Sequence, residues 1–246
     1  MVKLLSIIIP VYNEERLISK ALREVVMAKT PLFKKEIIII DDGSTDKTKA
    51  EVKKQIIKYA KKNVKIFLLE KPINQGKGKA VKTGFIKSKG DIVLVQDADL
   101  EYDPADYGIL LGPFLEKDAD VVYGSRFISN HPHRILYFWH QLGNNFLTLL
   151  SNIFTNLNFS DMETGLKAFD GNLIRKLAKH LQSGRFGFEP EITALIAKKK
   201  NLKIYEVGVS YQGRTYAEGK KIGWKDGIEA IYIILKSNLF RQYNNL

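Results

Sequence analysis

The first half of the chain alternates short apolar runs with longer stretches in which apolar residues recur every third or fourth position. Apolar runs bounded by turn-forming residues are typical of buried strands, whereas the wider spacing is typical of amphipathic helices. Strands are predicted over residues 4–11, 36–40, 64–69, 91–96 and 120–123. Helices are predicted over residues 15–28, 46–59, 77–87 and 103–115, with Asn13 as the expected N-cap of the first. This alternation predicts an α/β fold with right-handed crossovers and a mostly parallel sheet.

Polar, turn-forming clusters follow four of these predicted strands. They lie at residues 10–14, 41–44, 75–79 and 97–99. Because ligands of parallel sheets bind beyond the carboxyl ends of the strands, we expect the four clusters to converge on one edge and form a site. Each cluster taken alone also fits an ordinary loop or a helix cap.

The segment Asp97-Ala98-Asp99 carries the strongest chemical signal of the chain. In an extended chain, side chains alternate between two sides, so Asp97, Asp99 and Glu101 would share one side. Three neighbouring carboxylates repel one another unless a cation lies among them, and oxygen ligands suit Mg²⁺ or Mn²⁺. The segment therefore predicts a metal ion that bridges to a substrate's diphosphate. A solvated acidic turn explains the motif alone equally well.

Composition excludes several classes of protein. The chain has 246 residues, 45% of them hydrophobic, and no cysteine, which excludes disulfides, thiolate metal sites and cysteine nucleophiles. The net charge of +12 favours anionic partners, although lysines between residues 53 and 62 supply part of it as solvated helix charge. The apolar start is too short for a signal-peptide core. No window reaches the roughly 18 apolar residues that a membrane-spanning helix needs.

Ordered motifs along the chain resemble those of the family 2 glycosyltransferases, most closely the dolichyl- and polyprenyl-phosphate sugar synthases. The four polar clusters are followed by further motifs at residues 123–127 (Tyr-Gly-Ser-Arg-Phe), 161–169 (Asp-Met-Glu-Thr-Gly-Leu-Lys-Ala-Phe), 186–191 (Phe-Gly-Phe-Glu-Pro-Glu), 213–216 (Gly-Arg-Thr-Tyr) and 219–224 (Gly-Lys-Lys-Ile-Gly-Trp). Each motif is weak alone, whereas the ordered set is specific. The resemblance extends from the first strand to about residue 227.

The resemblance implies a GT-A fold, a Rossmann-like sheet flanked by helices, with amphipathic interface helices near the C-terminus. It implies one catalytic domain over residues 1–227, with a nucleotide-sugar half (1–126) and an acceptor half (127–227), and an amphipathic tail over 228–246. The implied reaction is metal-dependent, inverting transfer of a hexose from a UDP-glucose-like donor or GDP-mannose to a polyprenyl or dolichyl phosphate. The implied cofactor is Mg²⁺ or Mn²⁺.

The resemblance also assigns roles to individual residues. Contacts with the base and ribose are implied for Pro10, Val11, Tyr12, Glu14, Asp41 and Asp42. Further contacts with the nucleotide-sugar or phosphates are implied for Gly76, Lys79, Asp97, Ala98, Arg126, Arg134 and Arg214. Asp99 is the firmest metal ligand, with Asp97 and Glu101 beside it. Mannosyl-phosphate synthases often have Gln at the position of Glu101, so this chain departs from them by one negative charge.

Four residues are the expected catalytic set: Asp97, Asp99, Arg126 and Asp161. Arginine suits the phosphates because a guanidinium binds them bidentately and stays protonated. A phosphate acceptor is already an anion, so direct attack on the anomeric carbon needs no general base, and Asp161 is expected to orient substrate. Glu189 and Glu191 are the alternative bases, although both also fit the acidic first turn of a helix. The four histidines lack metal-ligand spacing and are interpreted as surface or interfacial residues.

Two apolar stretches, at residues 135–139 and 146–154, and the tail at 227–240 have amphipathic character flanked by cations. Three interpretations fit these stretches. The helices could lie in the headgroup plane of an anionic membrane, they could pack on the core of the protein, or they could associate with a second copy in a homo-oligomer. With the resemblance, we expect a peripheral protein at the cytoplasmic membrane face.

Three other functions fit parts of the pattern. A glycosyltransferase with a polysaccharide or other hydroxyl acceptor would need a carboxylate base. A nucleotidyltransferase could also use paired aspartates. Nucleic-acid binding would use the net charge, but no nucleic-acid motif is present and no such partner is expected.

Overall fold

The computed structural model describes residues 3–30, 32–62, 64–128, 134–135, 137–215 and 223–241. Within these ranges, seven strands form one sheet in the order β3-β2-β1-β4-β6-β5-β7. The strands are β1 (Lys3–Val11), β2 (Phe33–Asp41), β3 (Val64–Glu70), β4 (Ile92–Val95), β5 (Val121–Ser125), β6 (Lys167–Asp170) and β7 (Ile204–Gly208). All neighbours pair in parallel except β6, which runs antiparallel to both β4 and β5.

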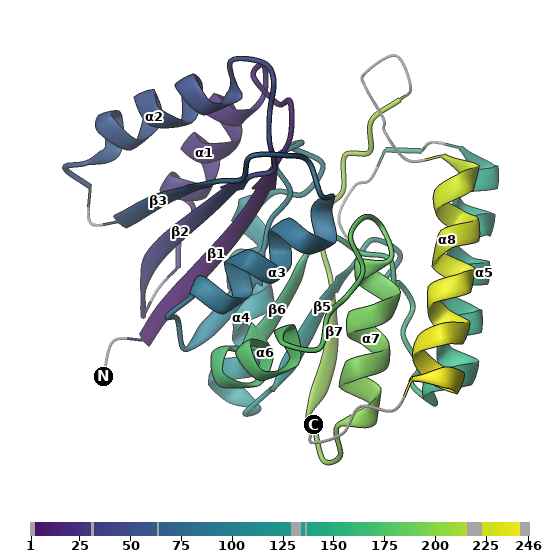
Figure 1. Cartoon of the computed structure of the whole chain (residues 1–246). Coiled ribbons are helices and arrows are strands. Elements are labelled where there is room, and N and C mark those ends of the chain that lie inside the picture. The colour runs from purple at the N-terminus through teal and green to yellow at the C-terminus, as the bar shows by residue number, and fades with distance from the viewer. Residues whose placement is uncertain are drawn as a thin grey trace.

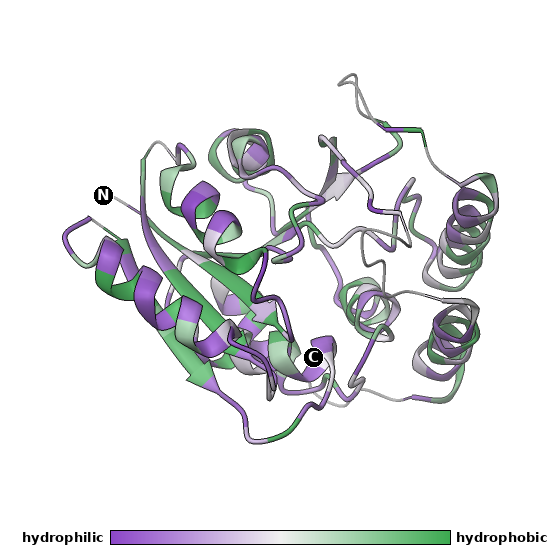
Figure 2. Ribbon diagram, turned by 90° about the horizontal axis from the view of Figure 1, so that it is seen from above, coloured by the Kyte–Doolittle hydropathy of each residue, from purple (hydrophilic) through white to green (hydrophobic). Residues whose placement is uncertain are grey.

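Helices cover both faces of this sheet (Figure 1). They are α1 (Ile18–Met27), α2 (Thr48–Tyr59), α3 (Lys77–Lys87), α4 (Tyr107–Glu116), α6 (Gly171–Ala178) and α7 (Phe188–Lys198). The inner strands β1, β2, β4 and β5 carry the most hydrophobic residues (Figure 2) because helices bury them on both faces. In β1, Ile7 and Ile9 pack with α1, α2 and α4, whereas Ile8 packs with α3, α6 and α7. This period-two division creates two cores, one on each face of the sheet. Because β1, β2, β3 and β4 run parallel, the loops after them lie at the same edge.

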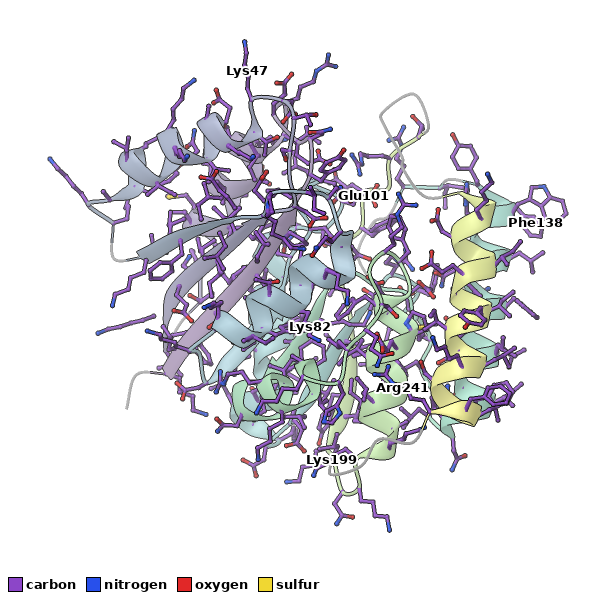
Figure 3. All side chains as sticks on the ribbon, viewed as in Figure 1. Lys47, Lys82, Glu101, Phe138, Lys199 and Arg241 are labelled. Carbon is purple, nitrogen blue, oxygen red and sulfur yellow. The ribbon has the colours of Figure 1, made fainter. Side chains whose placement is uncertain are left out.

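Two further helices, α5 (Phe138–Thr155) and α8 (Trp224–Leu235), form a pair beyond α7 (Figure 1). A short π-helical segment, Lys236–Phe240, continues α8. Large apolar side chains of α5 face outward, and Phe138 projects away from the molecule (Figure 3). No helix in the described ranges is long and apolar enough to cross a bilayer.

The α/β class and the mostly parallel sheet predicted from the sequence are confirmed, and α3 spans the predicted residues. Some local predictions were wrong. The predicted helix at 103–115 divides into a 3₁₀ turn, Pro104–Asp106, and α4. Asn13 does not cap α1, which begins after Leu17 without a side-chain cap; Asn13 instead has a positive φ of 52° and accepts a hydrogen bond from Thr45.

Candidate functional site

The four polar clusters meet at the carboxyl edge of the sheet, as the sequence predicted. The Asn13 backbone N–H donates to Ser44 Oγ at 3.0 Å, which joins the first cluster to the second. The backbone N–H groups of Gln75 and Gly76 donate to Asp42 Oδ2 at 3.0 and 2.6 Å, which joins the second to the third. Lys77, at the start of α3, donates to Asp97 of the fourth cluster at 2.9 Å, which joins the third cluster to the fourth.

Two adjacent aspartates after β2 have different environments. Asp42 is buried, and its carboxylate accepts from Lys71 as well as from the loop before α3. Its oxygens therefore hold the site together. Asp41 is also buried; its Oδ2 accepts from the Ser44 backbone N–H at 3.1 Å, while Oδ1 has no hydrogen-bond partner among the described residues. A buried acceptor without a donor costs free energy, so Asp41 Oδ1 suits a ligand N–H or O–H.

The end of β1 and the loop after it supply the other residues expected at the base and ribose. Pro10 is half-buried, Val11 is buried, and Tyr12 is 38% exposed. The Glu14 backbone N–H donates to Thr48 Oγ1 at 2.8 Å, which ties the loop before α1 to the start of α2. Val11 pairs with Asp41 in the sheet, so the end of β1 lies beside Asp41.

Gly76 shapes the entrance to α3. Its φ is +92°, and an added Cβ would meet the backbone of Gly184. Glycine is required for both reasons. The Lys79 backbone N–H donates to the same Gly184 carbonyl, at 3.2 Å, so the loop before α3 packs tightly against the segment before α7.

The acidic segment after β4 is a turn and not an extended chain, so the expectation that three carboxylates share one side of a strand was wrong. Ala98 and Asp99 form the turn, Leu100 has a φ of +64°, and the Glu101 backbone N–H donates to Asp99 Oδ1 at 3.2 Å. Ala98 is buried beneath the carboxylates. The turn still brings the acids close enough to interact: burial and the charges of Asp97 and Glu101 raise the pKa of Asp99 to about 7.

Cations from distant segments meet each of these carboxylates. Lys77 Nζ lies 2.9 Å from Asp97 Oδ2. Arg214 lies 2.9 Å from Asp99 Oδ2 through Nη2 and 3.1 Å from Glu101 Oε1 through Nε. Tyr211 also donates to Glu101, at 2.8 Å, so both Glu101 oxygens are engaged. The segment after β7 therefore closes over the acidic turn.

Oxygen-only donors and mutual repulsion at Asp97 and Asp99 fit a hard divalent ion. Within the described ranges, no three His, Cys, Asp or Glu side chains are arranged together as a metal-binding group. The complete ligand set of Asp97, Asp99 and Glu101 stays a prediction, since protein cations contact all three carboxylates and would have to yield to the metal ion.

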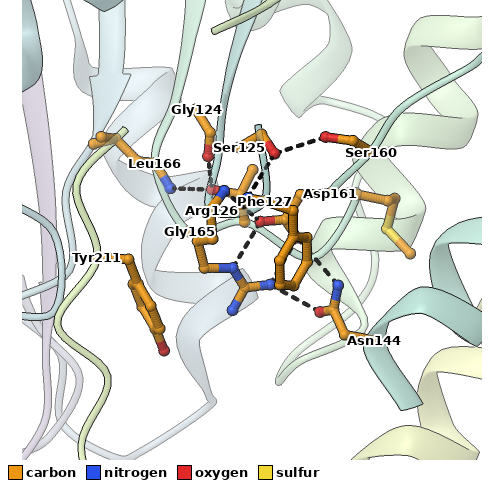
Figure 4. Close-up of polar contacts among 12 residues, drawn as sticks. Gly124, Ser125, Arg126, Phe127, Asn144, Ser160, Asp161, Gly165, Leu166 and Tyr211 are labelled. Carbon is orange, nitrogen blue, oxygen red and sulfur yellow. Dashed lines mark hydrogen bonds and ion pairs between the residues drawn. The ribbon is translucent and has the colours of Figure 1, made fainter. Parts of the chain in front are cut away.

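Arg126 and Asp161 form a largely buried, bidentate ion pair (Figure 4). Arg126 Nε donates to Asp161 Oδ2 and Nη2 donates to Oδ1, both at 2.7 Å, and the Arg126 backbone N–H also donates to Oδ2 at 3.1 Å. Asn144 of α5 accepts from Arg126 and donates to Asp161. Burial alone would raise the pKa of Asp161, but the guanidinium and these hydrogen bonds hold it below its usual value. An ionised and fully bonded Asp161 is suited to orienting Arg126 and poorly suited to accepting a proton.

The remaining predicted arginine, Arg134, is exposed and donates to the Gly213 carbonyl at 3.2 Å. The Arg126 guanidinium lies 5.2 Å from the centre of the Tyr211 ring. Arg126 and Arg134 therefore both contact the 211–214 segment, to which Arg214 itself belongs, although this segment lies much later in the sequence.

Sequence reasoning missed a buried ionic cluster behind the acidic turn. Lys77 bridges Asp97 to Glu189 of α7, at 2.9 and 3.0 Å. Glu163 and Lys167 interact electrostatically with this cluster; burial raises the pKa of Glu163 and lowers that of Lys167, each to about 8. The available signal was the charged residues Glu163 and Lys167 within the mostly apolar segment 162–169.

Glu191, one of the two alternative bases, is fully engaged by protein. It accepts from the backbone N–H groups of Gln182 and Ser183 and from the Arg241 guanidinium. His140 packs edge-to-face on Tyr137, while His131 and His133 lie outside the described residues.

A mostly parallel sheet, an acidic turn beyond its central strand β4 and a polar edge closed by basic residues define the GT-A class of glycosyltransferases. Residues 6–178 match the sequence model of Glycosyl transferase family 2, and the chain belongs to this family. It is therefore a glycosyltransferase.

Known proteins agree with this assignment. A dolichyl-phosphate beta-glucosyltransferase of Trichomonas vaginalis is 29% identical over 97% of this chain and 74% of its own length. A UDP-N-acetylglucosamine–dolichyl-phosphate N-acetylglucosaminyltransferase of Methanococcus voltae is 27% identical over 95% of both chains. The crystal structure of glucosyl-3-phosphoglycerate synthase of Mycobacterium tuberculosis with Mn²⁺ and UDP-glucose has a TM-score of 0.71 at 20% identity, covering 98% of this chain and 80% of that one. At that identity the likeness concerns the fold.

Proposed function

We propose that the protein transfers a hexose from a UDP-sugar to a polyprenyl or dolichyl phosphate, with inversion at the anomeric carbon and with a divalent metal ion. The observation that carries this proposal is that Arg126 and Arg134 contact the 211–214 segment, whose own Arg214 contacts Asp99 of the acidic turn. A transfer between a diphosphate donor and a phosphate acceptor brings two anionic groups together. Arginines on one side and a carboxylate-bound cation on the other suit such a pair.

The named relatives support the donor and the acceptor. Both curated relatives act on dolichyl phosphate, one as a glucosyltransferase and the other with UDP-N-acetylglucosamine. The structural neighbour holds Mn²⁺ and UDP-glucose. The relatives differ in the sugar, so the donor hexose of this chain is to be determined by assay.

At the donor, Asp41 Oδ1 would accept an N–H of the base, and Asp97 and Asp99 would hold the metal. A bound Mg²⁺ or Mn²⁺ neutralises negative charge on the leaving diphosphate. Arg214 already lies beside Asp99 and would add a guanidinium to the same charge. These groups stabilise the charge that develops as the glycosidic bond breaks.

At the acceptor, the phosphate oxygen is itself the nucleophile, since it is ionised at neutral pH. The locked Arg126–Asp161 pair agrees with this mechanism because Asp161 has no free position from which to take a proton. Arg126 would instead position the acceptor phosphate, with its orientation fixed by Asp161 and Asn144.

A lipid acceptor also suits the outward face of α5. Apolar side chains recur along it every third or fourth residue, and they are well exposed: Phe138, Trp139, Leu142, Phe146, Leu149 and Ile153. Ile228 and Tyr232 of α8 are exposed as well, and Lys225 and Lys236 lie on the same helix or directly after it. Such a face suits peripheral binding to an anionic bilayer. Because Asn144 on α5 contacts the Arg126–Asp161 pair, the same helix would join the membrane to the acceptor site.

A transfer assay tests the reaction. The protein is incubated with Mg²⁺ or Mn²⁺, polyprenyl phosphate and labelled UDP-glucose, UDP-N-acetylglucosamine or GDP-mannose, and lipid-extracted label is counted. Metal-dependent labelling that is lost in Asp99→Asn and kept in the exposed control Asp118→Asn supports the proposal. Nucleotide-sugar binding without lipid labelling, but with transfer to a sugar hydroxyl, would establish a hydroxyl acceptor instead.

The membrane contact is tested with vesicles of phosphatidylglycerol and phosphatidylcholine. Phe138→Ser/Trp139→Ser should co-sediment less than the parent protein while it binds UDP equally well. If vesicle binding is unchanged and size-exclusion chromatography shows that the variant dissociates a dimer, the α5 face is a contact between copies of the chain.

A further inference from the structure

We propose that Glu163 and Glu189 form the subsite that binds hydroxyl groups of the transferred hexose; this inference rests on the proposed function. Both residues carry a buried carboxylate oxygen, Glu163 Oε1 and Glu189 Oε2, without a hydrogen-bond partner among the described residues. Glu189 as a whole is only 3% exposed. Buried carboxylate oxygens are normally satisfied by protein donors, so these two suit donors that arrive with a ligand.

The position of Glu189 is the first argument for a sugar. Lys77 Nζ contacts Asp97 Oδ2 at 2.9 Å and Glu189 Oε1 at 3.0 Å, so a single ammonium joins the two carboxylates. Asp97 belongs to the acidic turn that would hold the diphosphate. In a nucleotide-sugar, the sugar is attached to the diphosphate. Lys77 alone separates Glu189 from Asp97, so the Glu189 carboxylate lies where hydroxyl groups of the sugar would be.

Glu163 approaches the same place from a different segment. It lies between Asp161, which holds Arg126, and Gly165, whose Cα packs against the Asp97 carboxylate so closely that a Cβ would collide with it. Among the charged groups, Glu189 contributes most to the raised pKa of Glu163. Residue 163 therefore belongs to a segment that contacts the acidic turn through Gly165 and the proposed acceptor arginine through Asp161.

Lys77 holds the Glu189 side chain through Oε1, at 3.0 Å, and a buried hydroxyl holds its backbone. Thr193 Oγ1 donates to the Glu189 carbonyl at 2.8 Å and lies 2.9 Å from the buried Tyr123 hydroxyl. Lys167 Nζ lies 4.5 Å from the centre of the same tyrosine ring and donates to the Met162 carbonyl. A rigid, buried acceptor loses little conformational entropy when a ligand binds, which is the requirement for discriminating one hydroxyl pattern from another.

Charge distinguishes a hydroxyl ligand from an anion. Asp97 and Glu189 would repel another phosphate or carboxylate. Lys77 and Lys167 already supply two ammonium groups to the cluster. A neutral polyol with O–H donors satisfies the free oxygens without adding charge to a buried region.

Glu191 shows that the free oxygen of Glu189 is not a general property of the first turn of α7. Glu191 is buried in the same turn, yet it accepts from two backbone N–H groups and from Arg241. Among the residues that the structure describes, one glutamate of this turn is thus fully bonded, whereas one oxygen of the other has no partner.

The test compares the affinities for UDP and for UDP-glucose in the presence of Mg²⁺, by isothermal titration calorimetry. The variants are Glu163→Gln and Glu189→Gln, and the matched control is Glu116→Gln at an exposed position of α4. Each subsite variant should bind UDP as the parent does but lose about tenfold in affinity for UDP-glucose, the size expected for one charged hydrogen bond. Unchanged UDP affinity shows that the variant is folded.

Deoxy donors make the test specific. Removal of the hydroxyl that contacts Glu163 should weaken binding to the parent and have little further effect in Glu163→Gln, because the same hydrogen bond is already lost. Additive losses for every deoxy donor, or an unchanged preference for UDP-glucose in both variants, would overturn the subsite while leaving the proposed function intact. A parent protein that binds no nucleotide-sugar would overturn the proposed function and the subsite with it.

Discussion

Replacement of Glu163 by Gln should stabilise the protein above neutral pH and have little effect at pH 4. Burial and the Glu189 charge raise the pKa of Glu163 from an ordinary 4.5 to about 8, against the opposing effects of Lys167 and Arg126. The folded protein therefore holds this proton more tightly than the unfolded chain does. As the pH rises from 4.5 to 8, the unfolded chain gives up the proton first, and stability falls across that window. The glutamine side chain of the variant carries no charge, so the variant avoids this loss.

The size of the effect follows from the shift. Each pKa unit corresponds to about 1.4 kcal/mol, which sets an upper limit of about 5 kcal/mol for Glu163. Glu163 is half-buried, and both Lys167 and Glu189 can adjust to its charge, so we expect roughly 2 to 3 kcal/mol at pH 9. The difference between the two pH values isolates this charge from any change in packing that the substitution causes.

Equilibrium urea denaturation of the parent and of Glu163→Gln, at intervals from pH 4 to pH 9, measures the difference. At low pH, the urea midpoints of parent and variant should differ only by the constant amount that a change in packing causes. At pH 9, the difference between the midpoints should be larger by up to about 1 M urea. Glu116→Gln controls for the loss of one surface charge. Parallel curves for parent and variant over the whole range would show that Glu163 does not bear an unmatched buried charge, and our account of the cluster would be wrong.

Three other substitutions test separate parts of the structure. Gly76→Ala should lower the free energy of unfolding by about 2 kcal/mol or more, since φ is positive and the added Cβ meets a backbone carbonyl; an unchanged urea midpoint would contradict this. Arg126→Ala should cost about 3 to 5 kcal/mol by leaving Asp161 buried without its partner, and a loss under about 1 kcal/mol would refute a buried pair. Glu191→Gln should speed amide hydrogen exchange in the π-helical segment Lys236–Phe240, because it weakens the bond to the Arg241 guanidinium that follows this segment; unchanged exchange would show that the contact is dispensable.

The part of the fold that the sequence predicted well depends on burial from both sides. β1 and β4 are apolar at nearly every position and β2 contains four consecutive isoleucines, because helices cover both faces of the sheet, and such runs are visible without an alignment. β6 could not be found in this way. It has four residues, begins with Lys167, and exists because it fits antiparallel between β4 and β5, which is a long-range pairing. β7 likewise lacks a fully buried residue.

The acidic turn shows how local geometry can change a correct chemical inference. The sequence placed Asp97, Asp99 and Glu101 at the end of a strand, and the structure places them there. The period-two argument failed because the strand ends at Val95 and Leu100 adopts a positive φ. The acids still interact, but Glu101 points toward Tyr211 and Arg214, residues more than a hundred positions away that only the fold brings near.

The two glutamates of α7 show what kind of information the sequence lacks. Glu189 and Glu191 are two residues apart, both lie in an acidic first turn, and both are buried, so no local pattern separates a free carboxylate from a bonded one. Their roles depend on partners from other segments. Glu191 meets the loop after α6 and the guanidinium of Arg241, which leaves it no free oxygen, whereas Glu189 meets Lys77 and keeps one. The residue type decides what a carboxylate can bind. The donors that the fold brings within reach decide whether the carboxylate still has an oxygen to offer a ligand. A search for catalytic and binding carboxylates in this chain therefore has to count unsatisfied oxygens, and that count selects Glu189 over Glu191.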